Sequence, residues 1–550
     1  MNRKKGYLLF ILSILFLIGS IFFNAANDTS IKNIILLIPD GMSVGNVTLT
    51  RWFLNGENLS WEEYICGLVK TYSADSPVAD SAPAGTAMAT GYKSHTGYIS
   101  VLPDVANMPG QKEIPVELRK APIATILEAA KLIGKSTGLI ATSNIQHATP
   151  AVFSAHWPDR NNYEAIAEQM LYNNVDVLMG AGLEFFVNRK DNENLLEEMI
   201  RYGYTIVENK EQLLKVSSSK VAYLSNSLAL PYDFDRNEEE IPSLSEMTKK
   251  AIEILSKNKN GFFLMVEGSK IDWANHANDP VGVISDILAF NDAVKVALDF
   301  AKKSKNTAVI VVSDHSTGGF SIGNSNTSKN YDKTQLMDFI LPLKLAKVTG
   351  EGLETILLKT DSLDLIKIKE IVLNYYGIMD LNDDEAKTIE NYINDAKNDP
   401  KKAGRLNYIV GPMISKRANI GWTTNGHAGD DVEIAIYNPK GYKLSGIIEN
   451  TDIAKFMSKL FNVDLDKITE KYFVKAQNLS KIAGAEYIIN KDNPENPVFI
   501  MKKNNIEIKI PANKDYIFVN NKIYKVKLIN VYNGSDFYIQ NDIIDFFNKK

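Results

Sequence analysis

The sequence has very little cysteine and no marked excess of charge of either sign. Its single cysteine, Cys66, excludes an intrachain disulfide, so the fold must depend on its core and on any metal ions it binds. We interpret Cys66 as a small buried apolar residue. The 66 acidic and 61 basic residues nearly cancel, which gives no sign of a nucleic-acid-binding protein or of a disordered acidic chain. The composition therefore indicates a globular protein, and 550 residues are enough for more than one domain.

One long hydrophobic run stands at the N-terminus. The basic segment 2–5 precedes the apolar run 6–23, and small and polar residues follow. This layout is typical of an export signal, so we predict that residues 1–26 are a signal peptide, cleaved near Ala26. The run is also near the lower length limit for crossing a bilayer, which makes an uncleaved anchor the alternative. Either way, the body of the protein is predicted to lie outside the cytoplasm, whether secreted, periplasmic or attached to a membrane or cell envelope.

Short apolar runs alternate with amphipathic helical patterns, such as 123–134 and 284–304, along most of the chain. This alternation predicts an α/β fold with a large, mostly parallel central sheet flanked by helices. Ligands of such sheets bind beyond the carboxyl ends of the strands. The runs that we interpret as buried strands cover residues 33–39, 136–142, 175–180, 261–268, 306–315 and 431–439.

Two segments depart from this alternation. Residues 321–420 are first polar and then helical, and we interpret them as an insertion between two core strands of a main domain that covers residues 27–465. From about residue 466, apolar and polar residues alternate and turn signals such as Asn-Asn and Asn-Gly recur. Residues 466–550 are therefore predicted to form a small β-rich appended domain.

Potential metal ligands gather at the ends of the predicted strands and in nearby loops. Asp272 and His276 are four residues apart, so one helical turn would direct both side chains at one ion. Glu267 ends an apolar strand, where a carboxylate without a partner would be costly to bury. His427 lies in a Gly-rich loop. Mixed imidazole and carboxylate ligands suit Zn²⁺, whereas hydroxyl and carboxylate oxygens suit Mg²⁺.

The segment VADSAPAGTAMATG, residues 78–91, places an acid and a hydroxyl, Asp80 and Ser81, before a run of very small residues. Both are good residues for a helix start, and helix N-termini present free N–H groups to anions. The small residues would let the backbone approach a ligand closely. The alternative is an ordinary capped helix that packs tightly against a neighbour.

Six motifs, in their order and spacing, resemble the alkaline phosphatase family. The resemblance spans roughly residues 31–460 and implies an enzyme that hydrolyses small phosphate monoesters through a phosphoserine intermediate. It further implies a two-zinc, one-magnesium centre, and it leaves a homodimer open. The motifs are IPDGM, VADSAPAGTAMATG, QHATPA with the later Arg160, VEGSKIDWANHA, SDHSTGG and TTNGHAGDDV.

Carried over to this sequence, the resemblance implies a role for each matching residue. Ser81 is implied to be the nucleophile, Arg160 the clamp on the phosphate oxygens, and Asp80 the residue that orients Arg160. The implied metal ligands are carboxylates, imidazoles and one hydroxyl. The first zinc has Asp272, His276 and His427, and the second has Asp40, Asp314 and His315, with Ser81 also reaching the second zinc. Magnesium has Asp40, Thr149 and Glu267.

Two positions depart from the pattern of the family. His147 stands where some members have Asp, and Trp273 stands where some have Lys. An imidazole at His147 would either ligate a metal or hydrogen-bond to a ligand, so the identity of the third ion stays open. His95 and His156 match no ligand position, and we interpret both as structural.

Two other function classes are compatible with parts of the sequence. A phosphodiesterase or a sulfatase would use the same core. A non-catalytic envelope-binding protein is suggested by the β-rich domain and by the N-terminal segment. The pairing of Ser81 with Arg160 favours monoesters over diesters and sulfates. Every expected reactive position is filled, which favours an enzyme over a binding protein.

Overall fold

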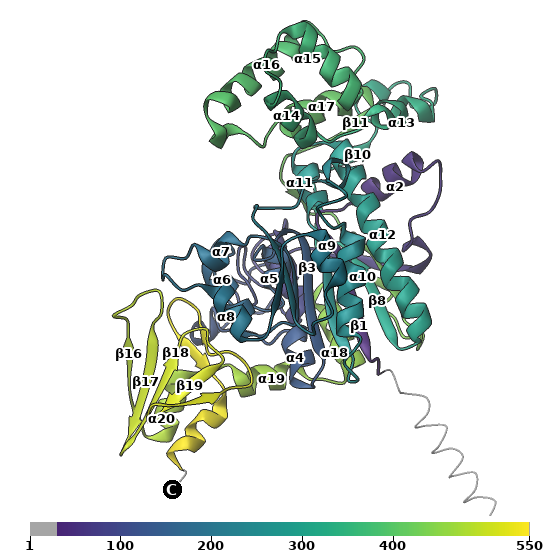
Figure 1. Ribbon diagram of the computed structural model, residues 1–550. Helices are drawn as coiled ribbons and strands as arrows, with labels where there is room; N and C mark the ends of the chain where they lie inside the picture. Colours follow the sequence, from purple (N-terminus) through teal and green to yellow (C-terminus); the bar gives the residue numbers. More distant parts are fainter. Residues whose placement is uncertain (1–29, 549–550) are drawn as a thin grey trace, which may run out of the picture.

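The computed structural model describes residues 30–548 (Figure 1). The predicted signal peptide or anchor, residues 1–26, lies outside the described residues. Among the described helices, none combines the length and the apolar character needed to span a bilayer.

A ten-stranded sheet forms the centre of the molecule, with the strand order β14-β2-β13-β8-β1-β7-β3-β4-β6-β5. Strand β13 runs antiparallel to its neighbours β2 and β8, and the other neighbouring pairs are parallel. The prediction of a large, mostly parallel sheet is therefore confirmed. The strands are β1 (Asn33–Pro39), β2 (Ile65–Lys70), β3 (Ser136–Asn144), β4 (Val177–Ala181), β5 (Thr205–Val207), β6 (Val221–Ser225), β7 (Phe262–Gly268), β8 (Thr307–Val312), β13 (Val432–Tyr437) and β14 (Gly446–Glu449).

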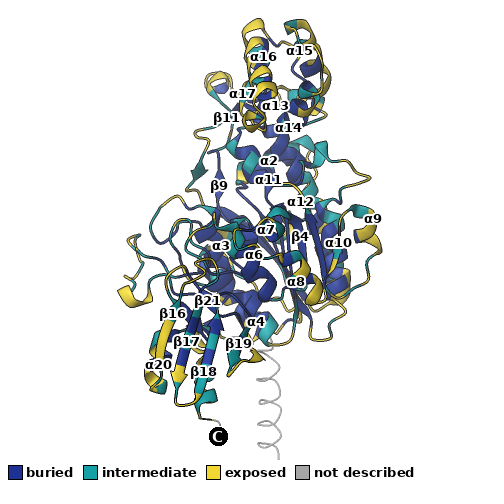
Figure 2. Ribbon diagram, turned by 60° about the vertical axis from the view of Figure 1, so that its left-hand side comes forward, coloured by how far each residue is buried: buried dark blue, intermediate teal, exposed yellow. Residues whose placement is uncertain are grey.

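Both faces of the sheet are covered, which is why its central strands are apolar throughout. In β1, Leu36 faces one hydrophobic core and Leu37 faces the other, because side chains alternate along a strand. Strands β1, β7 and β8 are buried along their whole length, and the centre of the molecule in Figure 2 has the dark blue of buried residues. The covering helices are α3 (Ser81–Thr90), α4 (Ile126–Leu132), α6 (Tyr163–Tyr172) and α18 (Thr451–Phe461) on the Leu36 face, and α10 (Leu244–Leu255), α11 (Lys270–His276) and α12 (Pro280–Ser304) on the Leu37 face.

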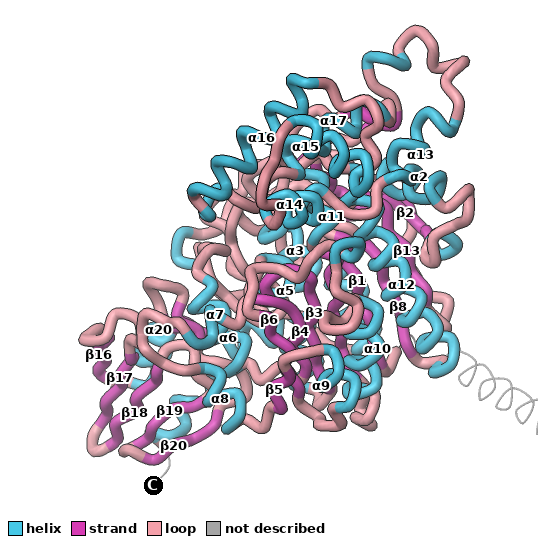
Figure 3. Tube along the Cα trace, turned by 45° about the horizontal axis from the view of Figure 1, so that its top comes forward, coloured by secondary structure: helices cyan, strands magenta, loops and turns pink. Residues whose placement is uncertain are grey.

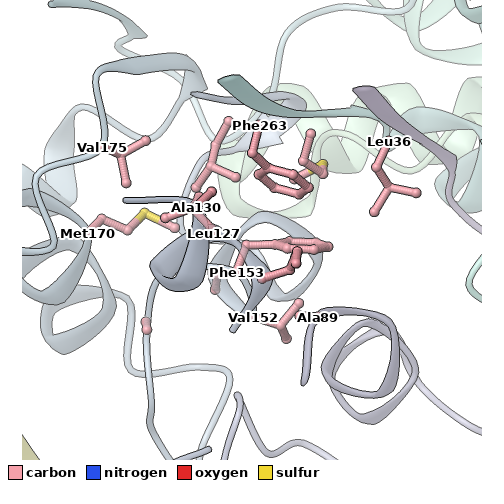
Figure 4. Close-up of a cluster of buried hydrophobic side chains, with 14 of the residues drawn as sticks. Leu36, Ala89, Leu127, Ala130, Val152, Phe153, Met170, Val175 and Phe263 are labelled. Atoms are coloured by element: carbon pink, nitrogen blue, oxygen red, sulfur yellow. The ribbon is translucent and has the colours of Figure 1, made fainter. Parts of the chain in front are cut away.

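The core on the Leu36 face joins strands to helices from distant parts of the sequence. Leu36 and Phe263 of the sheet, Leu127 of α4 and Phe153 belong to one buried cluster (Figure 4). The rings of Phe153 and Phe263 have centroids 5.7 Å apart. Burying an aromatic or leucine side chain stabilises a fold by roughly 1.5–3 kcal/mol, so this cluster fixes the helices that carry the site.

A helical region lies beyond the carboxyl edge of the sheet, at the top of Figure 1. Its chain segment falls between β8 and β13, where the insertion was predicted. Helix α16 begins at the cap Asn382 and buries Ala386, Ile389, Ile393 and Ala396 along one face, as an amphipathic helix does. The helices of this region are α13 (Leu336–Leu345), α14 (Gly350–Leu358), α15 (Leu365–Ile371), α16 (Asp383–Asn398) and α17 (Asn407–Arg417).

The C-terminal region is rich in strands, as predicted. A five-stranded antiparallel sheet has the order β16-β17-β18-β19-β20. In β17, Phe499 and Met501 are buried and alternate with less buried residues, which is the pattern of a sheet with one covered face. The strands are β16 (Glu486–Asn490), β17 (Val498–Lys503), β18 (Ile506–Pro511), β19 (Tyr516–Val519) and β20 (Lys522–Lys525), and helices α19 (Leu465–Tyr472) and α20 (Ala476–Ala483) precede them.

Cys66 differs from its prediction. Its side chain, in β2, is half-buried rather than fully buried, and it packs against the core of the Leu36 face. Strand β2 lies second from one edge of the sheet, where coverage by helices is incomplete. A position near the edge therefore explains the partial exposure.

Candidate metal centre and active site

Three acidic residues, at or just after the ends of neighbouring strands, lie at one edge of the central sheet. Strand β1 lies between β7 and β8 and is parallel to both. Asp40 directly follows β1, Glu267 is near the end of β7, and Asp314 follows β8. The carboxyl ends of neighbouring parallel strands share an edge, so the fold brings these carboxylates together.

The first group of ligand atoms lies beside the hydroxyl of Ser81. Asp40, Asp314 and His315 each offer one ligand atom, and these atoms lie within 4.8 Å of one another. His315 Nε2 is 3.6 Å from Asp40 Oδ1 and 3.3 Å from Asp314 Oδ2. Ser81 Oγ lies 3.1 Å from the same Nε2 atom. A cation bound by this group would therefore lie close to the Ser81 hydroxyl.

A second group shares His315. Asp272, His315 and His427 offer ligand atoms within 4.8 Å of one another, and His276 Nε2 lies 3.3 Å from Asp272 Oδ2. His427 reaches this place because β12 (His427–Ala428) pairs with β9 (Ser316–Thr317) directly after His315. His427 Nδ1 is 2.9 Å from the carbonyl oxygen of Ala79. If Nδ1 donates to that carbonyl, Nε2 carries the free lone pair that binds a metal.

A third group places His147 among the carboxylates. Asp40, His147 and Glu267 offer ligand atoms within 4.8 Å of one another. Thr149, in α5 (Ala148–Ala151), donates its hydroxyl to Asp40 Oδ2 at 3.3 Å. The structure thus gathers the oxygen ligands expected for magnesium, and it adds the imidazole whose role the sequence left open.

These groups fit metal ions because several of their buried atoms have no other partner. Within residues 30–548, no hydrogen bond reaches Asp40 Oδ1, Asp314 Oδ2 or either carboxylate oxygen of Glu267. Leaving buried acceptors bare costs free energy, and close carboxylates also repel one another. A bound cation would remove both penalties.

Burial and the nearby negative charges raise the pKa values of two of these carboxyl groups. Burial, together with the charges of Asp314 and Asp272, raises the pKa of Asp40 well above its ordinary value. Burial raises the pKa of Glu267 to about 8. A nearby dication reverses this effect, since it favours the ionised carboxylates.

Two of the imidazoles are held in the neutral form that ligates metals. Burial, and then the charge of His315, lowers the pKa of His427 to about 3. Burial, and then the charge of Arg160, lowers the pKa of His147 to about 3. A neutral imidazole keeps a free lone pair, so both side chains are ready to bind a cation.

Helix α3 begins beside the three groups of potential metal ligands, and its small residues pack closely against neighbouring segments. Asp80 caps the helix by accepting from Ala82 N at 2.7 Å, and its other oxygen accepts from Gly97 N at 3.0 Å. A Cβ on Gly85 would lie 2.9 Å from Val152 Cγ2, so glycine is needed for close packing there. The helix therefore packs tightly, as one interpretation of segment 78–91 predicts, and its first residue lies beside His315. That this helix start approaches a ligand stays a prediction.

Arg160 lies between that helix start and His147. Its Nη1 atom is 3.5 Å from Asp80 Oδ1, and its Nη2 atom is 3.1 Å from His147 Nε2. The backbone N of Arg160 donates to Gly97 O at 2.8 Å. The guanidinium thus faces the same space as Ser81.

The remaining histidines lie outside the three groups. His156 is buried, with Nδ1 2.9 Å from Ser100 O and Nε2 2.9 Å from Glu128 Oε1. His95 pairs with Asp75 at 3.5 Å. These contacts agree with the structural roles expected for both histidines.

A cavity of about 540 Å³ opens above Ser81, and the helical region forms one of its walls. Sequence reasoning missed this wall, because none of its residues belongs to a motif and its position depends on how distant helices dock. The residues from the helical region are Glu351, Gly404, Arg405, Asn407 and Tyr408. The others are Ser81, His147, Arg160, Asp272, Trp273, His276 and His427.

Comparison with known proteins gives consistent matches. The family model described as alkaline phosphatase matches residues 31–463. Alkaline phosphatase 3 of Bacillus subtilis (strain 168) is 37% identical over 81% of this chain and 92% of its own length.

Among solved structures, a cold-active alkaline phosphatase from a psychrophilic Shewanella sp. has a TM-score of 0.67 and 30% identity, covering 78% of this chain and 99% of that one. A histidine-to-aspartate variant of the alkaline phosphatase from the Antarctic bacterium TAB5, with magnesium bound in its M3 site, has a TM-score of 0.54 and 27% identity. The match covers 79% of this chain and 99% of that one.

Proposed function

This chain belongs to the alkaline phosphatase family and is a phosphomonoesterase, and on that premise we propose how it works. It is an exported enzyme with two zinc ions and one magnesium ion, and it releases inorganic phosphate and an alcohol through a phosphoserine at Ser81. The observation that supports this proposal is the 3.1 Å distance between Ser81 Oγ and Nε2 of His315, a residue that two of the groups share. Relatives named alkaline phosphatase favour this function over a phosphodiesterase, a sulfatase or a non-catalytic protein.

The proposed ligands follow the three groups described above. Bound there, the zinc ions would lower the pKa of the Ser81 hydroxyl and stabilise the oxygen of the departing alcohol. His147 lies beside the proposed magnesium ligands and is able to serve as a further one. The ligands are Asp272, His276 and His427 for one zinc, Asp40, Asp314 and His315 for the other, and Asp40, Thr149 and Glu267 for magnesium.

Three residues of the chain then have separate roles in phosphoryl transfer. Ser81 Oγ attacks the phosphorus atom, and the new bond forms as the bond to the alcohol oxygen breaks. Water then cleaves the phosphoserine and restores the Ser81 hydroxyl. Arg160 offers two parallel donors to the phosphate oxygens, and Asp80 holds the guanidinium.

Arg160→Ala is expected to remove about 2–4 kcal/mol of transition-state stabilisation, as the loss of an oxyanion donor does elsewhere. This corresponds to a loss in kcat/KM of about 30- to 1,000-fold for p-nitrophenyl phosphate. Arg160→Lys keeps the charge but loses the planar fork, so it should recover only part of the activity. A loss of less than about tenfold in the alanine variant would argue against a clamp.

His147→Asp is expected to strengthen magnesium binding by at least about tenfold, because it adds a hard, charged oxygen beside Asp40 and Glu267. The TAB5 variant with magnesium in its M3 site motivates this test. Calorimetric titration with Mg²⁺ measures the affinity, and His147→Asn is the matched control without the charge. Equal affinities in the aspartate and asparagine variants would contradict a magnesium site at this position.

Export is the part of the proposal that the N-terminal sequence supports. The order of basic, apolar and small residues in 1–26 is that of a signal peptide. N-terminal sequencing of the mature protein tests it, and we expect the chain to start close to residue 27. A mature protein that still begins at residue 1 would indicate the anchor instead.

A further inference from the structure

The wall that the helical region adds to the cavity includes one positively charged side chain, which is not among the proposed catalytic residues or metal ligands. Arg405 lies just before α17, and it lines the cavity together with Glu351 of α14 and Tyr408 of α17. Figure 3 shows α14 next to α11, the helix that carries Asp272 and His276, and α17 packs against α14. Lys270 of α11 and Glu351 of α14 form an ion pair at 2.9 Å, which is one of the contacts that hold this arrangement.

The backbone on both sides of Arg405 is held by a buried carboxylate. Glu354 is 3% exposed, and it accepts from Gly404 N at 2.6 Å and from Leu406 N at 2.9 Å. Tyr392 donates its hydroxyl to Glu354 at 3.0 Å and accepts from Arg405 N at 2.8 Å. Charge-assisted bonds of this kind are strong, so they hold the backbone of Arg405 at the cavity wall and leave its side chain exposed.

The charge of Arg405 has no partner in the part of the chain that the structure describes. Over residues 30–548, no hydrogen bond or ion pair involves its guanidinium. The one acidic residue of the same wall, Glu351, is neutralised by Lys270, whose Nζ lies 2.9 and 3.1 Å from its two oxygens. The wall therefore presents a net positive charge to whatever occupies the cavity.

Aromatic surfaces lie beside this charge. Tyr408 and Trp273 line the same cavity, and Tyr408 is 43% exposed. Burial raises the pKa of Tyr408, which the charge of Arg405 lowers and the charge of Asp272 raises. Tyr408, Arg405 and Asp272 line the same cavity. A substrate phosphate at Ser81 would leave its alcohol portion facing this wall.

We propose that Arg405 is a specificity-determining residue that binds a second anionic group, a carboxylate or a phosphate, on the alcohol portion of the substrate. The inference rests on the proposed function of the Ser81 site. It assigns the preferred substrates to the class of phosphate monoesters whose alcohol carries a further negative charge. Such a contact between a guanidinium and an anion is frequently bidentate, which lysine does not reproduce.

Two matched pairs of substrates test the proposal. The pair 3-phosphoglycerate and glycerol 3-phosphate differs by a carboxylate, and the pair fructose 1,6-bisphosphate and fructose 6-phosphate differs by a phosphate. We expect the wild-type enzyme to have a higher kcat/KM for the anionic member of at least one pair, and the favoured pair identifies the anion. In Arg405→Gln, that preference should fall by about tenfold, the effect of losing one charged hydrogen bond.

The controls separate a specific contact from a general field. Lys333 is an exposed cation of the helical region that does not line the cavity, so Lys333→Gln should keep the wild-type preference. Arg405→Lys should give an intermediate preference, and it serves as the test if Arg405→Gln does not fold. The wild-type preference should also weaken as ionic strength rises.

Each negative result has a separate meaning. No preference in the wild-type enzyme for either anionic substrate, or an unchanged preference in the Arg405 variants, would overturn the role of Arg405 while leaving the Ser81 chemistry intact. Failure of the metal-loaded wild-type enzyme to hydrolyse any of the four substrates or p-nitrophenyl phosphate would overturn the proposed function itself.

Discussion

Ser81→Ala is expected to lower kcat for p-nitrophenyl phosphate by at least about a thousandfold, because the variant has no oxygen to form the covalent intermediate. The substitution removes one hydroxyl, which lies 3.1 Å from His315, and leaves the carboxylates and imidazoles in place. The variant should therefore bind the same amount of zinc as the wild-type enzyme. Steady-state kinetics and elemental analysis of the purified protein measure the two quantities.

A matched serine shows whether the effect is specific. Ser76 lies five residues before Ser81, and its hydroxyl donates to Val78 O at 2.9 Å within a local turn. Ser76→Ala is expected to keep turnover close to that of the wild-type enzyme. If Ser81→Ala keeps its metals and retains more than about a tenth of the wild-type kcat, Ser81 is not the nucleophile.

Removal of metal by a chelator is expected to abolish activity and to lower the temperature of unfolding. Oxygen atoms of Asp40, Glu267 and Asp314 are buried without a hydrogen-bond partner, so the metal-free protein keeps unsatisfied polar groups in its core. Free metal at a thousand times its dissociation constant would stabilise the native state by about 4 kcal/mol. Calorimetry should therefore show a shift of at least about 3 °C on adding zinc and magnesium, together with recovery of activity.

Variants of one ligand and of one surface acid make this test specific. Asp314→Asn should reduce the stabilisation by zinc, because it removes a charged ligand that is 2% exposed. Asp452→Asn alters an acid at the start of α18, outside the three groups, and should leave that stabilisation unchanged. Equal unfolding temperatures with and without metal, in an active protein, would contradict a metal centre.

Much of the fold could be predicted because the central strands are continuous apolar runs. The runs 33–39, 261–268 and 306–315 correspond to β1, β7 and β8, which are buried on both faces. Their order in the sheet is not visible in the sequence, but the rule that ligands bind at the carboxyl edge does not depend on that order. This rule alone predicts that Asp40, Glu267 and Asp314 lie close together.

The parts that could not be predicted depend on contacts between distant segments. Arg405 and Tyr408 reach the cavity because α14 docks beside α11, where Lys270 pairs with Glu351, and because α17 packs against α14. No local pattern encodes that docking. His147 was ambiguous because its neighbours in space, Arg160 on one side and Asp40 with Glu267 on the other, come from different elements.

Trapping the covalent intermediate tests the central claim most directly. Metal-loaded enzyme is mixed with excess phosphate ester, quenched in acid within one turnover, digested and analysed by mass spectrometry. The account predicts a single phosphorylated residue, Ser81, in the peptide that contains residues 78–91. Phosphate on another residue, or rapid turnover with no phosphorylated peptide under the same quench, would contradict it.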